Sequence, residues 1–135
     1  MVERLTSTKI ADWLTTKYPL KFVTSPPITP ESPAAIGIIT MLAGQGFLDE
    51  KQFESRGFQL IIRGVQNNPL AVEDASMGID TLLHTMDMPW KPGGALVREL
   101  TWMGGGPAPQ QGMSFLMSYR YIWVCNYRTV SATGF

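Results

Sequence analysis

Residues 114–128 read SFLMSYRYIWVCNYR, and they carry the strongest periodicity in the chain. Every second residue is large or apolar, which is the alternation of a strand with one face in a core. The inward set is Phe115, Met117, Tyr119, Tyr121, Trp123, Cys125 and Tyr127. The residues between them are neither clearly polar nor clearly apolar. We therefore expect a long closing strand whose second face is suited to contact with another surface.

Three more segments have the composition of strands, at residues 35–42 (AIGIITML), 57–65 (GFQLIIRGV) and 95–103 (ALVRELTWM). Their alternation continues the two faces of the closing strand. On the core face we expect Phe58, Leu60, Ile62, Leu96, Leu100 and Trp102. On the opposite face we expect Gln59, Ile61, Arg63, Val97, Glu99, Thr101, Arg120 and Ile122. That second face is either half of an oligomer interface or a solvated surface with a few scattered isoleucines.

Two segments have the apolar spacing of helices. Residues 2–18 place Leu5, Ile10, Trp13, Leu14 and Tyr18 at helical intervals before a proline. Residues 69–86 follow an Asn68-Pro69 start and carry an apolar stripe from Ala71 to Met86. A proline-rich connector at 23–33 and a charged hairpin tip at about 44–56 complete the chain.

These elements predict an α+β fold: a four-stranded, mainly antiparallel sheet with two helices packed on one face, in the order α-β-β-α-β-β. The length of 135 residues fits one domain, 1–135.

Composition narrows the class of function. Charged residues make up 16% of the chain, below the usual quarter or so, which predicts that part of the surface faces protein. Eleven basic and eleven acidic residues cancel, so the chain lacks the charge of a protein that grips nucleic acid. One cysteine and one histidine cannot form a zinc site of the Cys/His type. The longest nearly apolar run, 34–43, is half a membrane span, and the first residues do not resemble a signal peptide, so we expect an intracellular, metal-free protein.

The stretch TWMGGGPAPQQGMS at 101–114 is glycine-rich without the features of a phosphate-binding loop. It lacks Gly-Lys-Ser/Thr and is followed by a strand where such loops open a helix. Its prolines also remove backbone donors. We expect a stiffened bend between two strands that touches a neighbouring subunit.

Candidates for catalysis are few. His84 lies four residues after Asp80 on the second helix, but Ser76 is too far along that helix to serve as its nucleophile. An exposed polar flank of the helix explains the pair better. Cys125 sits in the core alternation, where a buried inert thiol is expected.

The hairpin tip mixes Asp49, Glu50 and Glu54 with basic residues, which is typical of a solvated tip, although carboxylates can also bind a hard cation. The apolar residues Phe47, Leu48 and Phe53 are less expected in a solvated tip. They are either docking residues for another protein or fold back onto the core.

Taken in order, the signals AIGIITMLAGQG, RGFQLIIRGV, AVEDASMGIDTLLHTM and GGALVRELTWMGGGPAPQQGMSFLMSYRYIWV resemble the tail terminator (minor capsid or tail-completion) proteins of long-tailed bacteriophages. The resemblance covers roughly residues 3–128. It is carried by the strand ending in IIRG, the alanine-containing helix after a proline, and the W.GGP.P loop before the closing strand. Here Gln110-Gln111-Gly112 replaces a turn in which that family often has an acidic residue.

The resemblance implies a structural protein without enzyme activity or cofactor: a ring, usually a hexamer, that caps the tail tube, stops its growth and joins the tail to the head. Its partners would be copies of itself, the tail tube protein and head-tail connector proteins, while DNA passes through the lumen without specific binding. The ring would be assembled in the host cytoplasm and remain in the neck of the virion. The subunit-interface candidates are Ile61, Arg63, Glu99, Thr101, Arg120, Ile122 and Asn126. The docking-loop candidates are Phe47, Leu48, Phe53, Gly104, Gly105, Gly106, Pro107, Pro109 and Gln110.

Two alternatives stay open at this point. One is a head-completion or connector protein of the same neck. The other is a small enzyme or ligand-binding domain that uses His84 and the carboxylates.

Overall fold

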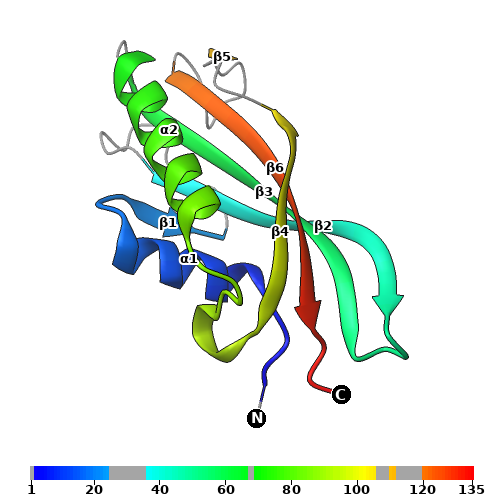
Figure 1. The fold of residues 1–135 in the computed structure, drawn as a ribbon. Helices are drawn as coiled ribbons and strands as arrows, with labels where there is room; N and C mark the ends of the chain where they lie inside the picture. The colour runs from blue at the N-terminus through cyan, green and yellow to red at the C-terminus, as the bar shows by residue number, and fades with distance from the viewer. Residues whose placement is uncertain (1, 25–35, 67–68, 106–109, 112–119) are drawn as a thin grey trace.

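A computed structural model describes residues 2–24, 36–66, 69–105, 110–111 and 120–135 (Figure 1). Its elements, in chain order, are α1 (Ser7–Lys17), β1 (Lys21–Val23), β2 (Ile36–Leu48), β3 (Phe53–Gln66), α2 (Pro69–Thr85), the 3-10 turn η1 (Pro92–Gly94), β4 (Val97–Gly105), β5 (Gln110–Gln111) and β6 (Arg120–Ala132). The expected α+β class is confirmed, and α2 lies within one residue of its expected bounds. Most of the expected connector 23–33 and residues 114–119 of the expected closing strand lie outside the described residues.

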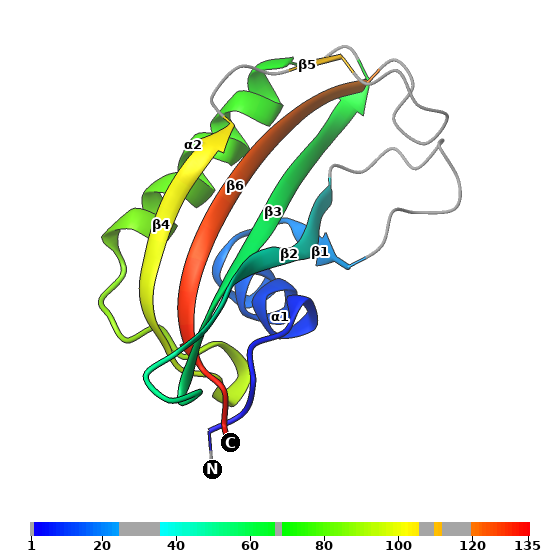
Figure 2. The same ribbon diagram turned by 90° about the vertical axis from the view of Figure 1, so that its right-hand side faces the viewer.

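The sheet has more strands than the four expected. Its order is β1-β2-β3-β6-β4, and the short β5 pairs with β6 beyond the end of β4 (Figure 2). The long strands pair antiparallel, whereas β1 runs parallel to β2, so the sheet is mixed. Three residues carry too little periodicity to predict β1. Its position depends on contact with α1 and on Phe22, whose ring lies against the bare Cα of Gly37.

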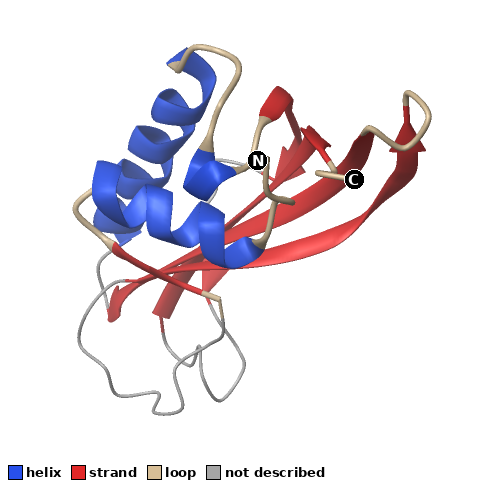
Figure 3. Cartoon of the chain, turned by 90° about the horizontal axis from the view of Figure 1, so that it is seen from below, coloured by secondary structure: helices blue, strands red, loops and turns tan. Residues whose placement is uncertain are grey.

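Both helices pack on one face of the sheet, as expected (Figure 3). Helix α1 begins later than expected, because Thr6 caps it by accepting a hydrogen bond from the backbone of Lys9 at 3.3 Å. The core between the helices and the sheet includes Ile10, Leu14, Val72, Ile79, Leu83, Ile39, Phe58, Leu60, Ile62, Trp123, Cys125 and Tyr127. The alternation of β3 and the described part of β6 therefore predicts the core face correctly.

The prediction fails in part on β4. Val97 was expected on the second face and is fully buried in the core, while Leu96 lies outside that core cluster. The reason is a bulge: Val97 pairs with Ser131 and Glu99 with Val130, so one extra residue reverses the alternation at the start of the strand. Alternation alone cannot locate such an insertion.

The hairpin between β2 and β3 has a shorter turn than the charged tip expected at about 44–56. Its strands continue to Leu48 and from Phe53, and the turn between them holds Asp49, Glu50 and Lys51 at positive φ. These three residues are exposed, as expected of a solvated tip. The expectation is wrong for Glu54, which is buried and paired with Arg4. The hairpin reaches well beyond the helices as an arm (Figure 1).

Candidate functional site

The face of the sheet away from both helices, here called the open face, is one of two candidate sites. Strand register places on it Ile36, Ile38, Thr40, Gln59, Ile61, Arg63, Ile122, Val124, Asn126, Arg128, Glu99 and Thr101. Six of the seven interface candidates from the sequence are in that set. The seventh, Arg120, pairs with Gln66 through its backbone, and its side chain is outside the described part.

The open face is mixed in character. Ile61, Ile122 and Val124 are partly exposed, and beside them the Gln59 side-chain amide donates a hydrogen bond to Asn126 Oδ1 at 3.2 Å. Ile36, Ile38 and Arg63 are buried within the single chain, so their side chains do not belong to the exposed part of this face. What remains accessible is an apolar patch around one cross-strand amide pair.

The open face has a depression next to two irregularities in strand pairing. The register of β2 against β3 shifts between Leu42 and Gly46, and that of β4 against β6 shifts between Trp102 and Gly104. A depression of about 310 Å³ lies between them, and Met103, 57% exposed, forms part of its wall. An exposed methionine beside a depression is suited to contact with a protein partner.

The hairpin arm carries two of the predicted docking residues on its surface. Phe47 is 49% exposed and Leu48 is also exposed, and the Phe47 ring contacts the exposed ring of Phe135 with centroids 5.7 Å apart. Phe53 is only partly buried, and the Arg98 guanidinium lies 4.1 Å from its ring centroid. Neither phenylalanine of the arm joins the core cluster, so the alternative in which they fold back onto the core is wrong for both.

The glycine-rich bend is described only in part. Gly104 and Gly105 have φ of +140° and +86°, conformations that favour glycine. A Cβ on Gly105 would overlap the Val124 carbonyl oxygen on β6, so the two backbones approach closely here. Gly106, Pro107 and Pro109 lie outside the described residues. Gln110 belongs to β5 and pairs with Ile122.

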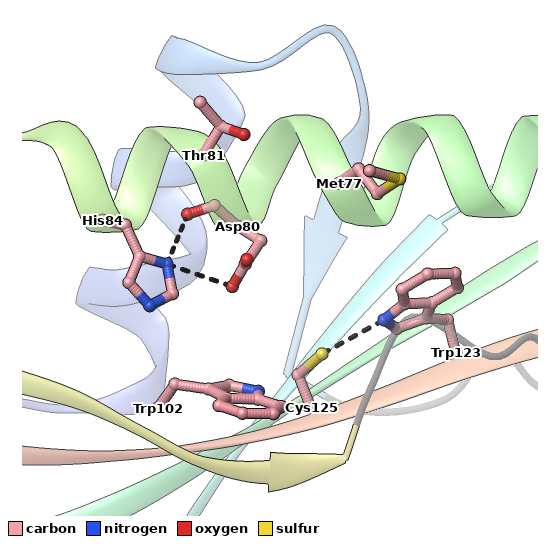
Figure 4. Close-up of a pocket in the computed structure, with 7 residues that line it drawn as sticks. All are labelled: Met77, Asp80, Thr81, His84, Trp102, Trp123 and Cys125. Atoms are coloured by element: carbon pink, nitrogen blue, oxygen red, sulfur yellow. Dashed lines mark hydrogen bonds and ion pairs between the residues drawn. The ribbon is translucent and has the colours of Figure 1, made fainter.

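The second candidate site is a cavity of about 320 Å³ between α2 and the ends of β4 and β6, here called the indole pocket. Its lining residues are Met77, Asp80, Thr81, His84, Trp102, Trp123 and Cys125. Figure 4 shows Asp80 and His84 on the helix facing Trp102, Cys125 and Trp123 on the strands. Trp102 was expected in the core, but it stands at the edge strand and is 45% exposed.

Asp80 organises the polar side of the indole pocket. The Tyr127 hydroxyl donates to Asp80 Oδ1 at 2.8 Å, and His84 Nδ1 lies 3.2 Å from the same oxygen and 2.8 Å from the Asp80 backbone carbonyl. Both neighbours of Nδ1 are acceptors, so Nδ1 carries the proton and Nε2 of the neutral ring is left as an acceptor. Burial, followed by the hydrogen bond to Asp80, raises the pKa of Tyr127 well above its ordinary value.

Cys125 is not set up as a nucleophile. Burial raises the pKa of its thiol, and the negative charge of Asp80 adds to that shift, although hydrogen bonds such as the one from Trp123 Nε1 at 3.1 Å oppose it. The thiol therefore stays protonated at neutral pH. Among the described residues, no group of three or more His, Cys, Asp or Glu side chains could hold a metal ion.

Sequence reasoning saw the Asp80–His84 pair but missed the indole pocket. Their spacing of four residues allows the two side chains to meet on one face of the helix, and in the structure His84 Nδ1 lies 3.2 Å from Asp80 Oδ1. The sequence gives no sign that Cys125 and Trp102 approach this pair, because the two residues are brought to α2 only by the pairing of β4 with β6. The one signal in the sequence that Trp102 is exposed on an edge strand is its place two residues before the glycine run that begins at Gly104.

Comparison with known proteins adds no relative. No model of a known protein family matches the chain, and no curated protein matches it. In the described part of the chain, neither helix has the length and apolar character needed to cross a membrane.

Proposed function

We propose that the chain is a structural subunit of a ring that caps the tail tube of a long-tailed bacteriophage, stops tube elongation and provides the surface for joining the tail to the head. The proposal begins from the sequence resemblance to tail terminator proteins. Copies of the chain, usually six, would associate head to tail in a closed ring in the neck of the virion. The role is structural, with no catalytic step.

The observation that carries the proposal is the partly exposed apolar patch on the open face. Both helices pack on one face, while Ile61, Ile122 and Val124 stay partly exposed on the other. Burial of a large apolar side chain stabilises by about 1.5–3 kcal/mol, so contact between this face and a neighbouring copy would contribute to ring closure. The low charged fraction of 16% fits a surface that is partly covered by protein.

The hairpin arm supplies a second contact. It extends past the helices and carries exposed Phe47 and Leu48 next to its terminal turn, which suits contact with an adjacent subunit or with the ring below. Equal numbers of acidic and basic residues suit a lumen through which DNA slides without being held.

The test is complementation of a phage in which the gene for this chain is deleted. Deletion is expected to give overlong tails, or tubes not joined to heads, in electron micrographs. The variant Ile122→Asp places a charge on the open face and is expected to restore neither length control nor joining. Leu70→Asp, an equal charge change at an exposed site of α2, is the matched control and is expected to complement. Normal virions from the deletion, or full complementation by Ile122→Asp, would contradict the proposal.

The same experiment separates the alternative of a head-completion or connector protein. Loss of length control with free heads assigns the ring to the tail tube. Tails of normal length that fail to join heads assign it to the head side of the neck. Purified Ile122→Asp must also retain the circular dichroism spectrum of the parent chain, so that misfolding is not mistaken for loss of contact.

A further inference from the structure

We propose that the indole pocket binds a flat organic cation of the guanidinium or amidinium class, held between the Trp102 ring and the Asp80 carboxylate. The site lies beneath α2, away from the open face, and the inference does not rest on the ring function. No lining residue among those described carries a permanent positive charge.

The Asp80 carboxyl group and the His84 ring offer hydrogen-bond acceptors to the pocket. Both described hydrogen-bonding partners of the Asp80 carboxyl group, Tyr127 and His84, meet Oδ1. Among the described residues none donates to Oδ2. In the neutral form of the His84 ring, Nδ1 donates to the Asp80 oxygens, and Nε2 is then a second acceptor. A ligand that matches these groups brings N–H donors and positive charge.

The apolar groups of the pocket favour a flat ligand. Trp102 offers an indole ring that is nearly half exposed, and tryptophan is the side chain that attracts a cation most strongly over its face. Trp123 lines the inner end, and its Nε1–H is occupied by Cys125 Sγ, so it contributes surface without an unpaired donor. Met77 completes the wall with a polarisable sulfur.

Size limits the ligand further. A cavity of about 320 Å³ is at the lower end of the range for small-molecule sites. It accommodates a benzamidine-sized molecule or the end of an arginine side chain. The shared chemistry is a planar cation with N–H donors, whether it comes from a free metabolite or from the arginine of a docked protein.

The experiment titrates the purified chain with benzamidine and with arginine amide, following tryptophan fluorescence and the heat of binding. Benzyl alcohol and benzoate are the neutral and anionic controls. Saturable binding of the cations, with neither control binding, is expected. Benzoate binding as tightly as benzamidine, or no saturation by either cation at millimolar concentration, would overturn the proposal.

Variants locate the binding. Asp80→Asn keeps the shape of the side chain and removes its charge, and it is expected to weaken benzamidine binding roughly tenfold or more. Asp74→Asn makes the same charge change at an exposed position of the same helix and is expected to bind like the parent chain. Trp102→Leu is expected to abolish the fluorescence response and weaken the binding heat. Equal binding by the two asparagine variants, each folded by circular dichroism, would refute the site.

A second experiment distinguishes the two sources of the cation. The mass of the chain in solution, alone and with any assembled copies, is measured with and without saturating benzamidine. Binding with unchanged mass assigns the site to a free small cation. Release of associated copies by benzamidine, and not by benzyl alcohol, assigns it to an arginine side chain of a neighbouring chain. Either result supports the cation class.

Discussion

The hydroxyl of Tyr127 offers a sharp test of the packing between α2 and the sheet. The ring is 2% exposed, stacks on Phe58 with centroids 5.1 Å apart, and its hydroxyl donates to Asp80 Oδ1 at 2.8 Å. Tyr127→Phe keeps the ring and removes that bond. A hydrogen bond to a charged group contributes about 1.5–3 kcal/mol, and we expect the lower end because the Asp80 side chain is 43% exposed and water can replace the donor.

The pH dependence gives the prediction its sign. The pKa of Tyr127 is raised in the folded chain, above about 10 in the unfolded chain. The stability contributed by the protonated hydroxyl is therefore fully present below pH 10 and is lost as pH rises towards the folded pKa. The loss is about 1.4 kcal/mol per pH unit for one proton. An advantage of about 1.5 kcal/mol over Tyr127→Phe at pH 7 should thus vanish near pH 11.

The assay is urea denaturation of both proteins at several pH values from 7 to 11. Most other titrating groups contribute equally to the two proteins, so the difference in the free energy of unfolding isolates Tyr127. Its hydroxyl should also ionise only on unfolding, which tyrosinate absorbance reports. A difference that stays constant up to pH 11, or that is absent at pH 7, would refute the reasoning.

Three further predictions concern stability, measured as the free energy of unfolding in urea. Arg4→Met removes the guanidinium that donates to both carboxylate oxygens of buried Glu54, at 2.6 and 3.0 Å. The free energy of unfolding should fall by about 1–3 kcal/mol, less than for a fully buried pair, because Arg4 is half exposed. No loss of stability would show that other groups satisfy the Glu54 carboxylate. Leu14→Ala empties a fully buried site of α1 and should cost about 2–5 kcal/mol, whereas a cost below 1 would mean that α1 is not docked. Gly44→Ala would drive its Cβ into the Ser55 carbonyl oxygen and should cost about 1–3 kcal/mol unless the β2 bulge relaxes.

Much of the fold could be predicted from local chemistry. The start of α2 at Pro69 follows from the fixed φ of proline, and the buried face of β3 and β6 follows from strict alternation through Phe58, Leu60, Trp123 and Cys125. Strand β1 could not be predicted, because its three residues are too few to show a period, and they are held by parallel pairing with β2 and by contact with α1.

The candidate sites divide in the same way. Residues that share a strand face, such as Ile61, Ile122 and Asn126, could be grouped from the sequence, because a period of two fixes which way side chains point. The buried state of Arg63 could not, since it depends on packing against the rest of the chain. The accessible patch is therefore smaller than alternation suggests.

By itself, the sequence determined the α+β class, both helices, the long strands and the absence of net charge, since propensity, periodicity and composition act over short stretches of chain. Only the tertiary structure decided where β4 bulges, so that Val97 points inward, and that Trp102 and Cys125 meet Asp80 and His84. Those contacts join residues up to 45 positions apart, from Asp80 to Cys125. Their positions are set by the register of β4 against β6 and by the docking of α2, which are long-range properties that no short stretch of sequence encodes.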